Sequence, residues 1–289
     1  MANNTFLIEE RSRDLGNFLV GRLLPFREKR LVGPFCFIDH MGPSTVGEGV
    51  YFDVDQHPHI GLCTLTYLMS GEIDHKDSTG AVQTITPGSV NLMISGKGVT
   101  HTERMPEHLR SAPAHTMHGY QVWIALPVEQ EEMEPQFAHI SKDALPRWKE
   151  DGFSFALVAG EAFGRTAPTP VFSPLFMVDV IAEKPGRLEI QGQLQGEIAI
   201  VVVKGEVLDG ETTIQQGQML VSKMEDECGL EVTEGTQLLL FGGKPLPEER
   251  FMYWNFVSHS KQRLEEAKKQ WQERRFPQVA GDETYIPMP

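Results

Sequence analysis

The sequence predicts an all-β protein made of two β-barrels, with one short helix near the C-terminus. Short β-rich runs fill most of the chain, and turns rich in Gly, Pro and Asp separate them. Many short strands at such spacing are typical of sandwiches and barrels. The sequence has no strand–helix alternation and no glycine-rich phosphate loop, which disfavours nucleotide chemistry. The clearest predicted strands are Thr64–Met69, Val82–Thr86, Val90–Ile94, Gln121–Leu126, Phe176–Ile181, Ile198–Val203 and Leu238–Phe241.

The two halves of the chain resemble each other, which predicts two copies of one barrel. The turn at Gly71-Glu72 and the strand after it have a counterpart at Gly205-Glu206. The boundary is expected within residues 128–149, where an acidic run precedes two prolines. We therefore predict three parts, which are an N-terminal barrel in residues 1–132, a linker in 133–150, and a C-terminal barrel with the helix and tail in 151–289.

One helix is expected near the C-terminus. Leu264, Ala267 and Trp271 fall on one helical face, and Ser260 is a suitable N-cap. The tail in residues 276–289 holds three prolines and several large apolar side chains. We expect this tail to be extended and to pack on a barrel.

Composition excludes several classes of function. The chain has 289 residues and a formal charge of −14, with a sequence pI of about 5.2. Such an acidic protein is repelled by phosphate backbones and anionic lipids, so direct nucleic-acid or membrane binding is not expected. Three scattered cysteines, Cys36, Cys63 and Cys228, suit a reducing compartment. With no signal peptide or membrane-spanning run in the sequence, we expect a cytoplasmic protein.

The histidines predict where the chemistry lies. Eight of the ten lie before residue 120. His57 and His59 are two positions apart, which places both imidazoles on one face of a strand. His101 and Glu103 repeat this spacing after enough turns for the second pair to return antiparallel beside the first. One such pair is often only a hydrogen-bonded structural pair, but two pairs predict a mononuclear metal site on His57, His59, His101 and Glu103.

The ligand types narrow the choice of metal. Three imidazoles and one carboxylate leave positions open at an octahedral ion for water, O₂ or a chelating substrate. This set suits Fe(II), Mn, Ni or Cu better than a closed tetrahedral zinc site, although zinc stays open as an alternative.

The same segments carry a resemblance to a known family. The chain resembles bacterial members of the pirin family, within the cupin superfamily, over nearly its whole length. The segments that carry the resemblance are 57–61, 64–72, 77–78, 96–103, 121–127, 254–258 and 285–289.

The resemblance implies a bicupin, a protein of two cupin-type barrels. It implies iron on His57, His59, His101 and Glu103 and a second barrel without a metal site. Several pirins are described as quercetin 2,3-dioxygenases, and others as redox-sensitive coregulators that bind proteins.

The chain departs from the commonest pirin pattern at two positions. Ile60 and Cys63 stand where many members carry arginine and glutamate. General cupins place a ligand glutamate at the position of Cys63. By strand parity we expect Cys63 to face the same side as His57 and His59. It would then be a thiolate ligand or, as an alternative, a small buried apolar residue.

Other side chains are candidates for the surroundings of the metal. His40 would stand at the pocket mouth or brace a loop, Gln121 would hydrogen-bond a ligand, and Met93 would line the pocket or belong to the core. His115 and His118 flank the Gln121 strand and would line the entrance. The groups expected in solvent are His75, Glu107 and His108.

The predicted function is a metal-dependent dioxygenase, with iron as the preferred metal. Its substrate would be a flavonol-like aromatic molecule that reacts with O₂, and Glu103 would act as the base. The alternative is a non-enzymatic redox sensor that binds a protein partner. A sugar isomerase or epimerase ranks last, because no cluster of Lys and Arg surrounds the motifs. We expect a monomer, since two barrels can cover each other's interface.

Overall fold

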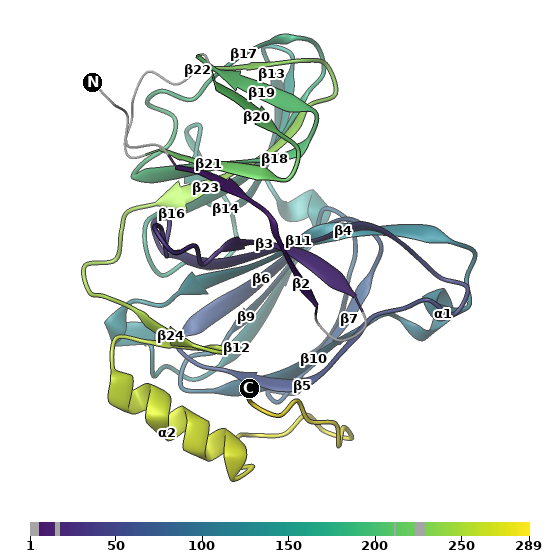
Figure 1. The fold of residues 1–289 in the computed structure, drawn as a ribbon, viewed down its shortest axis with the longest axis vertical. Coiled ribbons are helices and arrows are strands. Elements are labelled where there is room, and N and C mark those ends of the chain that lie inside the picture. The colour runs from purple at the N-terminus through teal and green to yellow at the C-terminus, as the bar shows by residue number, and fades with distance from the viewer. Residues whose placement is uncertain (1–5, 15–17, 211, 223–228) are drawn as a thin grey trace. The chain divides into compact units, whose positions relative to one another are not determined.

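The computed structural model describes residues 6–14, 18–210, 212–222 and 229–289 (Figure 1). The chain forms two compact units. The first, here the histidine barrel, comprises residues 12–20, 38–142 and 247–289. The second, the aliphatic barrel, comprises residues 1–11, 21–37 and 143–246. The predicted all-β architecture with a short C-terminal helix is confirmed. None of the described helices is long and apolar enough to cross a membrane.

Two facing sheets and a C-terminal hairpin carry the histidine barrel. The strands of these sheets, some of which extend beyond the residue ranges of the unit, are β2 (Arg11–Asp14), β3 (Leu19–Leu24), β4 (Phe35–Val46), β5 (Asp53–His59), β6 (Leu62–Ser70), β7 (Ile73–Asp77), β8 (Val82–Ile85), β9 (Val90–Ile94), β10 (Val99–Arg104), β11 (His115–Ala125), β12 (Gln136–Ile140), β24 (Phe251–Tyr253) and β25 (Phe256–Ser258). One sheet has the order β12-β9-β6-β11-β4-β3-β2, the other β5-β10-β7-β8, and β24 pairs with β25. The helices are α1 (Glu107–Arg110), η1 (Val128–Gln130), η2 (Lys142–Ala144) and α2 (Lys261–Gln272).

The aliphatic barrel is also built from two sheets. Its strands are β1 (Phe6–Glu9), β13 (Arg147–Glu150), β14 (Phe153–Ala162), β15 (Arg165–Thr166), β16 (Leu175–Ala182), β17 (Gly186–Glu189), β18 (Glu197–Lys204), β19 (Glu206–Asp209), β20 (Thr212–Gln215), β21 (Gln218–Ser222), β22 (Gly229–Val232) and β23 (Gln237–Gly243). The sheet orders are β1-β21-β18-β23-β16-β14-β13, with β15 on β14, and β17-β22-β19-β20.

The core of the aliphatic barrel follows from the period of two along its strands. Ile198, Ile200 and Val202 of β18 all enter the same buried cluster. Alternating β-branched residues of this kind fit a pleated surface with one face buried. This unit contains none of the ten histidines, all of which fall in the ranges of the histidine barrel.

The structure divides the chain differently from the predicted three parts. β1 pairs antiparallel with β21, so the N-terminal segment belongs to the aliphatic barrel rather than to residues 1–132. The helix and tail, expected with residues 151–289, belong to the histidine barrel. Residues 133–150 contain β12 and β13 and are not a plain linker. Strand pairing between distant segments leaves no local signal. The sequence therefore does not reveal that the N-terminal segment belongs to the aliphatic barrel and the C-terminal helix and tail to the histidine barrel.

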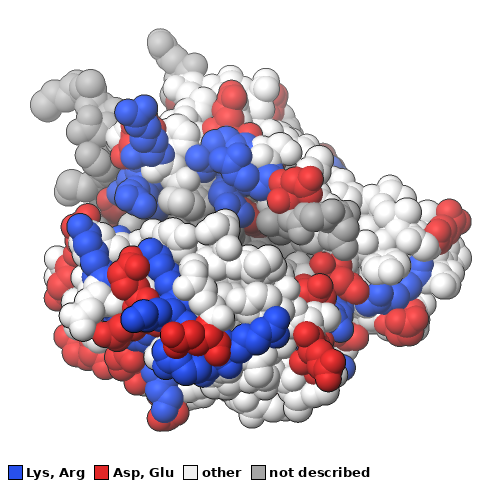
Figure 2. All heavy atoms as spheres, turned by 60° about the horizontal axis from the view of Figure 1, so that its bottom comes forward, with Lys and Arg blue, Asp and Glu red and all other residues white. Residues whose placement is uncertain are grey.

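The C-terminal helix forms as predicted. Ser260 Oγ accepts a hydrogen bond from the backbone N of Arg263 at 3.3 Å, which satisfies one free donor of the first turn. Leu264, Ala267 and Trp271 are its buried residues. Figure 2 shows basic and acidic side chains interspersed on the face of the molecule that lies at the bottom of Figure 1, where α2 runs.

Candidate metal centre

Two neighbouring antiparallel strands, β5 and β10, carry the predicted ligands. His101 lies directly opposite His57, and Val99 lies opposite His59. Beyond His101 the register shifts, so that Glu103 pairs with Val54. This irregularity has the form of a β-bulge, a feature that re-aims side chains near functional sites. The spacing of two in each strand and the antiparallel return therefore bring His57, His59 and His101 to one place.

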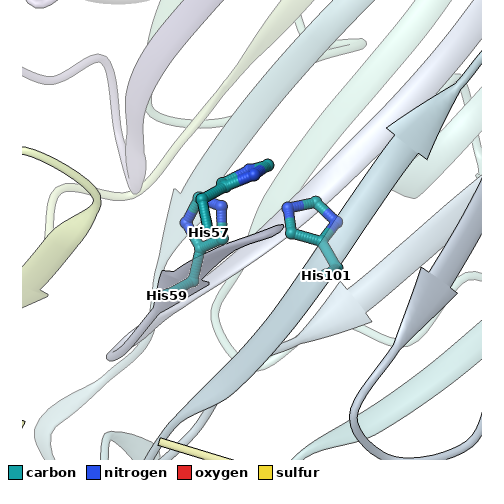
Figure 3. A group of neighbouring side chains, drawn as sticks. All are labelled: His57, His59 and His101. Atoms are coloured by element: carbon teal, nitrogen blue, oxygen red, sulfur yellow. The ribbon is translucent and has the colours of Figure 1, made fainter. Parts of the chain in front are cut away.

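The three imidazoles form a compact buried cluster (Figure 3). One candidate ligand atom from each of His57, His59 and His101 lies within 4.8 Å of the others. The ring centroids of His57 and His101 are 4.3 Å apart, and that of His59 lies 5.1 Å from His57 and 5.0 Å from His101. Three convergent imidazoles at this spacing are the donor set of a transition-metal site.

The hydrogen bonds of the rings leave nitrogen atoms available to an ion. His57 Nδ1 is 2.7 Å from the carbonyl oxygen of Asp55, so it donates there and its lone pair lies on Nε2. His59 Nδ1 and His101 Nε2 are buried with no hydrogen-bond partner among the described residues. Buried polar atoms are rarely left unpaired without a reason. A bound metal ion would satisfy both, so these residues fit the predicted group.

The lowered pKa values of the three histidines keep their rings neutral and able to bind a cation. Burial lowers the pKa of His57 to about 4 and holds the pKa values of His59 and His101 well below the usual value. The neighbouring imidazoles add to the depression at His59 and His101. All three rings are therefore neutral at pH 7 and keep the lone pairs that a metal requires.

The same pKa shifts predict a pH-dependent stability for metal-free protein. The unfolded chain takes up a proton at His57 near pH 6.5, whereas the folded chain does so only near pH 4. The free energy of unfolding should therefore fall as pH falls through this window. For His57 alone the loss is about 2 kcal/mol between pH 7 and pH 5. Urea unfolding of chelator-treated protein at pH 7, 6 and 5 measures this slope.

Two histidine variants provide the comparison. His57→Gln should make the slope shallower, and His108→Gln, which changes an exposed histidine, should leave it unchanged. An unfolding free energy that stays constant from pH 7 to pH 5 would contradict the burial of neutral histidines.

Glu103 lies beside the cluster but is not one of the three grouped residues. Burial raises the pKa of its carboxyl and outweighs the electrostatic influence of His75 and the hydrogen bond with Thr66, which lower it. The Thr66 hydroxyl also lies 2.7 Å from Gln121 Oε1. Both Gln121 Oε1 and the Glu103 carboxylate accept from Thr66, which has one hydrogen to donate, so Gln121 reaches Thr66 but does not pass a hydrogen bond on to Glu103. Coordination by Glu103 stays a prediction.

The structure places His75 and Asp77 next to the cluster, where the sequence reasoning had missed them. His75 was expected in solvent but is buried on β7, which pairs with β10. Its ring stacks on Phe137 with centroids 4.6 Å apart. His75 Nε2 is 2.9 Å from Asp77 Oδ2. Burial opposes ionisation, but hydrogen bonds from His75 and Thr79 outweigh it and lower the pKa of Asp77.

A sequence signal for these two residues does exist. His75 and Asp77 have the same spacing of two as the ligand pairs. What the sequence does not give is the register that sets β7 beside β10.

The outer side of β5 is held by the C-terminal tail. Gln56, adjacent to His57, forms hydrogen bonds to the tail through its backbone N–H, its backbone carbonyl and its side chain. Its Nε2 donates to the carbonyl of Thr284 at 3.0 Å, and its Oε1 accepts from the N of Val279 at 2.7 Å. Ile286 N donates to the Gln56 carbonyl at 3.0 Å. These contacts fix the backbone that aims His57 and His59.

Cys63 does not join the histidines, contrary to the parity argument. β5 ends at His59, and Gly61 turns the chain with φ +68° before β6 begins. Cys63 pairs with Ile94 and Ile124. It therefore faces the side of β6 opposite to Thr64, which pairs with Trp123, the residue whose ring lies 5.0 Å from His59. The turn resets the alternation, so parity does not carry over from His59 to Cys63.

His40 and Met93 lie on opposite faces of the same sheet. Met93 pairs with Thr64 and so shares the face of Trp123, beside the cluster. His40 stacks on Tyr120 with centroids 4.5 Å apart, and its Nε2 is 2.9 Å from His118 Nε2. Tyr120 alternates with Gln121 along β11 and therefore faces away from the cluster. The structure thus places His40 and His118 away from the predicted pocket.

Comparisons with known proteins agree with this architecture. Two family models match the chain, pirin over residues 17–124 and the pirin C-terminal cupin domain over residues 177–277. A pirin-like protein of Caulobacter vibrioides is 44% identical over 289 residues, which cover 98% of each chain.

Two solved structures of quercetin 2,3-dioxygenase from Acinetobacter baumannii also resemble the chain. The first has a TM-score of 0.90 and 34% identity and covers 99% of this chain and 95% of its own. The second has a TM-score of 0.85 and 26% identity and covers 96% and 98%. These matches and the family models confirm the two predicted cupin-type barrels.

Proposed function

The chain belongs to the pirin family, and from this premise we propose that it is a metal-dependent dioxygenase that cleaves a quercetin-like flavonol with O₂. Iron is the proposed metal, held by His57, His59 and His101, with Glu103 as a fourth ligand. The observation that supports this best is the cluster of three buried, neutral imidazoles, two of which have an unpaired ring nitrogen. Similarity to quercetin 2,3-dioxygenase structures supports the choice of substrate.

The residues around the cluster suit such a reaction. A bound transition metal would supply Lewis-acid activation and electron transfer between substrate and O₂. The Glu103 carboxyl, whose pKa is raised by burial, can take the hydroxyl proton of the flavonol and hold it. Thr66 lies between that carboxyl and Gln121 and can donate its hydroxyl hydrogen to the carboxyl. The rings of Trp123 and Phe137, which lie against His59 and His75, would offer apolar surface to an aromatic substrate.

The test is oxygen consumption by Fe(II)-loaded protein on addition of quercetin. Wild-type protein should consume O₂ in step with loss of the flavonol. His101→Ala should lower the rate by at least about a thousandfold, because a lost metal centre removes several kcal/mol of transition-state stabilisation. His108→Ala changes an exposed histidine and should keep the wild-type rate.

Failure of the test would be equally informative. If wild-type protein holds iron and consumes no O₂, the dioxygenase proposal is wrong for flavonols. The redox-sensor alternative then predicts a protein partner whose affinity differs between the Fe(II) and Fe(III) forms.

A further inference from the structure

His75 and Asp77 extend the hydrogen bonding of His101 away from the cluster. The Nδ1 atoms of His101 and His75 are 3.4 Å apart, and His75 Nε2 is 2.9 Å from Asp77 Oδ2. All three side chains are buried. Asp77 Oδ1 accepts from the backbone N and the hydroxyl of Thr79 at 2.8 and 2.6 Å, and from the N of Ala81 at 3.3 Å. Asp77 is thereby fixed with Oδ2 turned to His75.

The order of donors and acceptors determines the tautomer of each ring. A carboxylate only accepts hydrogen bonds, so His75 Nε2 carries the hydrogen. In the neutral form of His75 the other nitrogen is an acceptor, and His101 Nδ1 donates to it. The lone pair of His101 therefore lies on Nε2. That atom is the buried nitrogen of His101 with no hydrogen-bond partner among the described residues.

His101 differs in this respect from the other two histidines. His57 donates to the backbone carbonyl of Asp55, and His59 has a hydrogen bond to the backbone of Asn255. A carbonyl is a neutral dipole, whereas the hydrogen bonds that lead from His101 through His75 end on the carboxylate of Asp77. Hydrogen bonding toward a carboxylate increases the basicity of an imidazole ligand.

We propose that His75 and Asp77 are positioning residues of the metal centre. They hold His101 in the tautomer with its lone pair on Nε2 and make it the strongest donor of the three histidines. This inference rests on the proposed metal site, but it does not depend on the substrate or on turnover. It gives a role to two side chains that touch neither the metal nor the flavonol.

The first test compares Asp77→Asn with Asp74→Asn. Both positions lie on β7, but Asp74 faces the other side and accepts a hydrogen bond from the Thr84 hydroxyl at 2.5 Å. Chelator-treated protein is titrated with nickel(II) by calorimetry, and the Fe(III)/Fe(II) midpoint potential is measured on iron-loaded protein. Asp77→Asn should weaken nickel(II) binding about 10- to 100-fold. It should also raise the potential, because less negative charge reaches the ligand. Asp74→Asn should change neither.

The second test compares His75→Gln with His75→Phe. The glutamine oxygen can accept the hydrogen of His101 Nδ1, whereas phenylalanine fills space without accepting. Nickel(II) should therefore bind more tightly to the Gln variant than to the Phe variant. Near-UV circular dichroism checks that each variant is folded. If Asp77→Asn does not fold, this comparison decides alone.

The outcomes separate this inference from the proposed function. The proposed role of His75 and Asp77 would be wrong if wild type and Asp77→Asn had equal nickel(II) affinity and equal potential, and if the two His75 variants also bound nickel(II) equally. A protein that binds nickel(II) but consumes no O₂ contradicts the dioxygenase alone. A wild-type protein that binds no nickel(II) overturns both.

Discussion

Replacing His57 by alanine is expected to abolish stoichiometric metal binding. The variant removes one of the three convergent imidazoles, and the buried site loses a direct ligand. Loss of an outer-sphere partner alone costs about 10- to 100-fold in metal affinity, so loss of a direct ligand should cost more. Metal content after incubation with Fe(II) or nickel(II) and desalting should be one ion per wild-type chain and near zero for His57→Ala.

Thermal unfolding gives an independent measure of the same loss. A ligand present at 100 times its dissociation constant stabilises the folded state by about 2.7 kcal/mol. Added nickel(II) should therefore raise the Tm of wild-type protein and of the exposed-site control His108→Ala, but not that of His57→Ala. Equal Tm shifts in wild type and His57→Ala would contradict the assignment of the site.

Replacing Glu131 by alanine is expected to lower the free energy of unfolding more than any other substitution considered above. Glu131 and Arg250 form an ion pair at 3.0 Å, with side chains only 3% and 1% exposed. The carboxylate also accepts from the Ser258 hydroxyl at 2.8 Å and from the backbone N of His259 at 3.0 Å. The variant leaves a buried guanidinium with only the half-exposed carboxylate of Glu248, 3.7 Å away, as a counter-charge. Removing one partner of such a pair costs about 3–5 kcal/mol, measurable by urea unfolding.

Glu132, the residue after Glu131, provides a matched control for this prediction. Glu132 pairs with Arg263 at 2.7 Å, but its side chain is 58% exposed. Glu132→Ala should therefore cost less than about 1 kcal/mol. Similar losses in the two variants would mean that burial does not set the strength of the Glu131 pair.

Much of the fold and part of the site could be predicted because they depend on local periodicity. Alternating apolar residues and glycine turns gave the strands, and Leu264, Ala267 and Trp271 gave the helix. The spacing of two also gave the common side of His57 and His59, since strand geometry alone dictates it.

Other features depend on register between strands that are distant in sequence. The sequence does not state that β7 lies beside β10, so His75 was placed in solvent. It also does not state that β1 pairs with β21. Parity misplaced Cys63 because the left-handed turn at Gly61 resets the alternation. These are effects of tertiary pairing, which local pattern does not encode.

The hydrogen bonds of Gln56 have a consequence for the order of events during synthesis. Gln56 and Thr284 lie 228 positions apart in the chain, yet they bond directly. The strand with His57 and His59 is therefore translated well before the segment that secures its outer side. The cluster therefore acquires its final geometry only after residues 279–286 have been made. At the proposed metal site, insertion of the ion is therefore expected to follow synthesis of this segment.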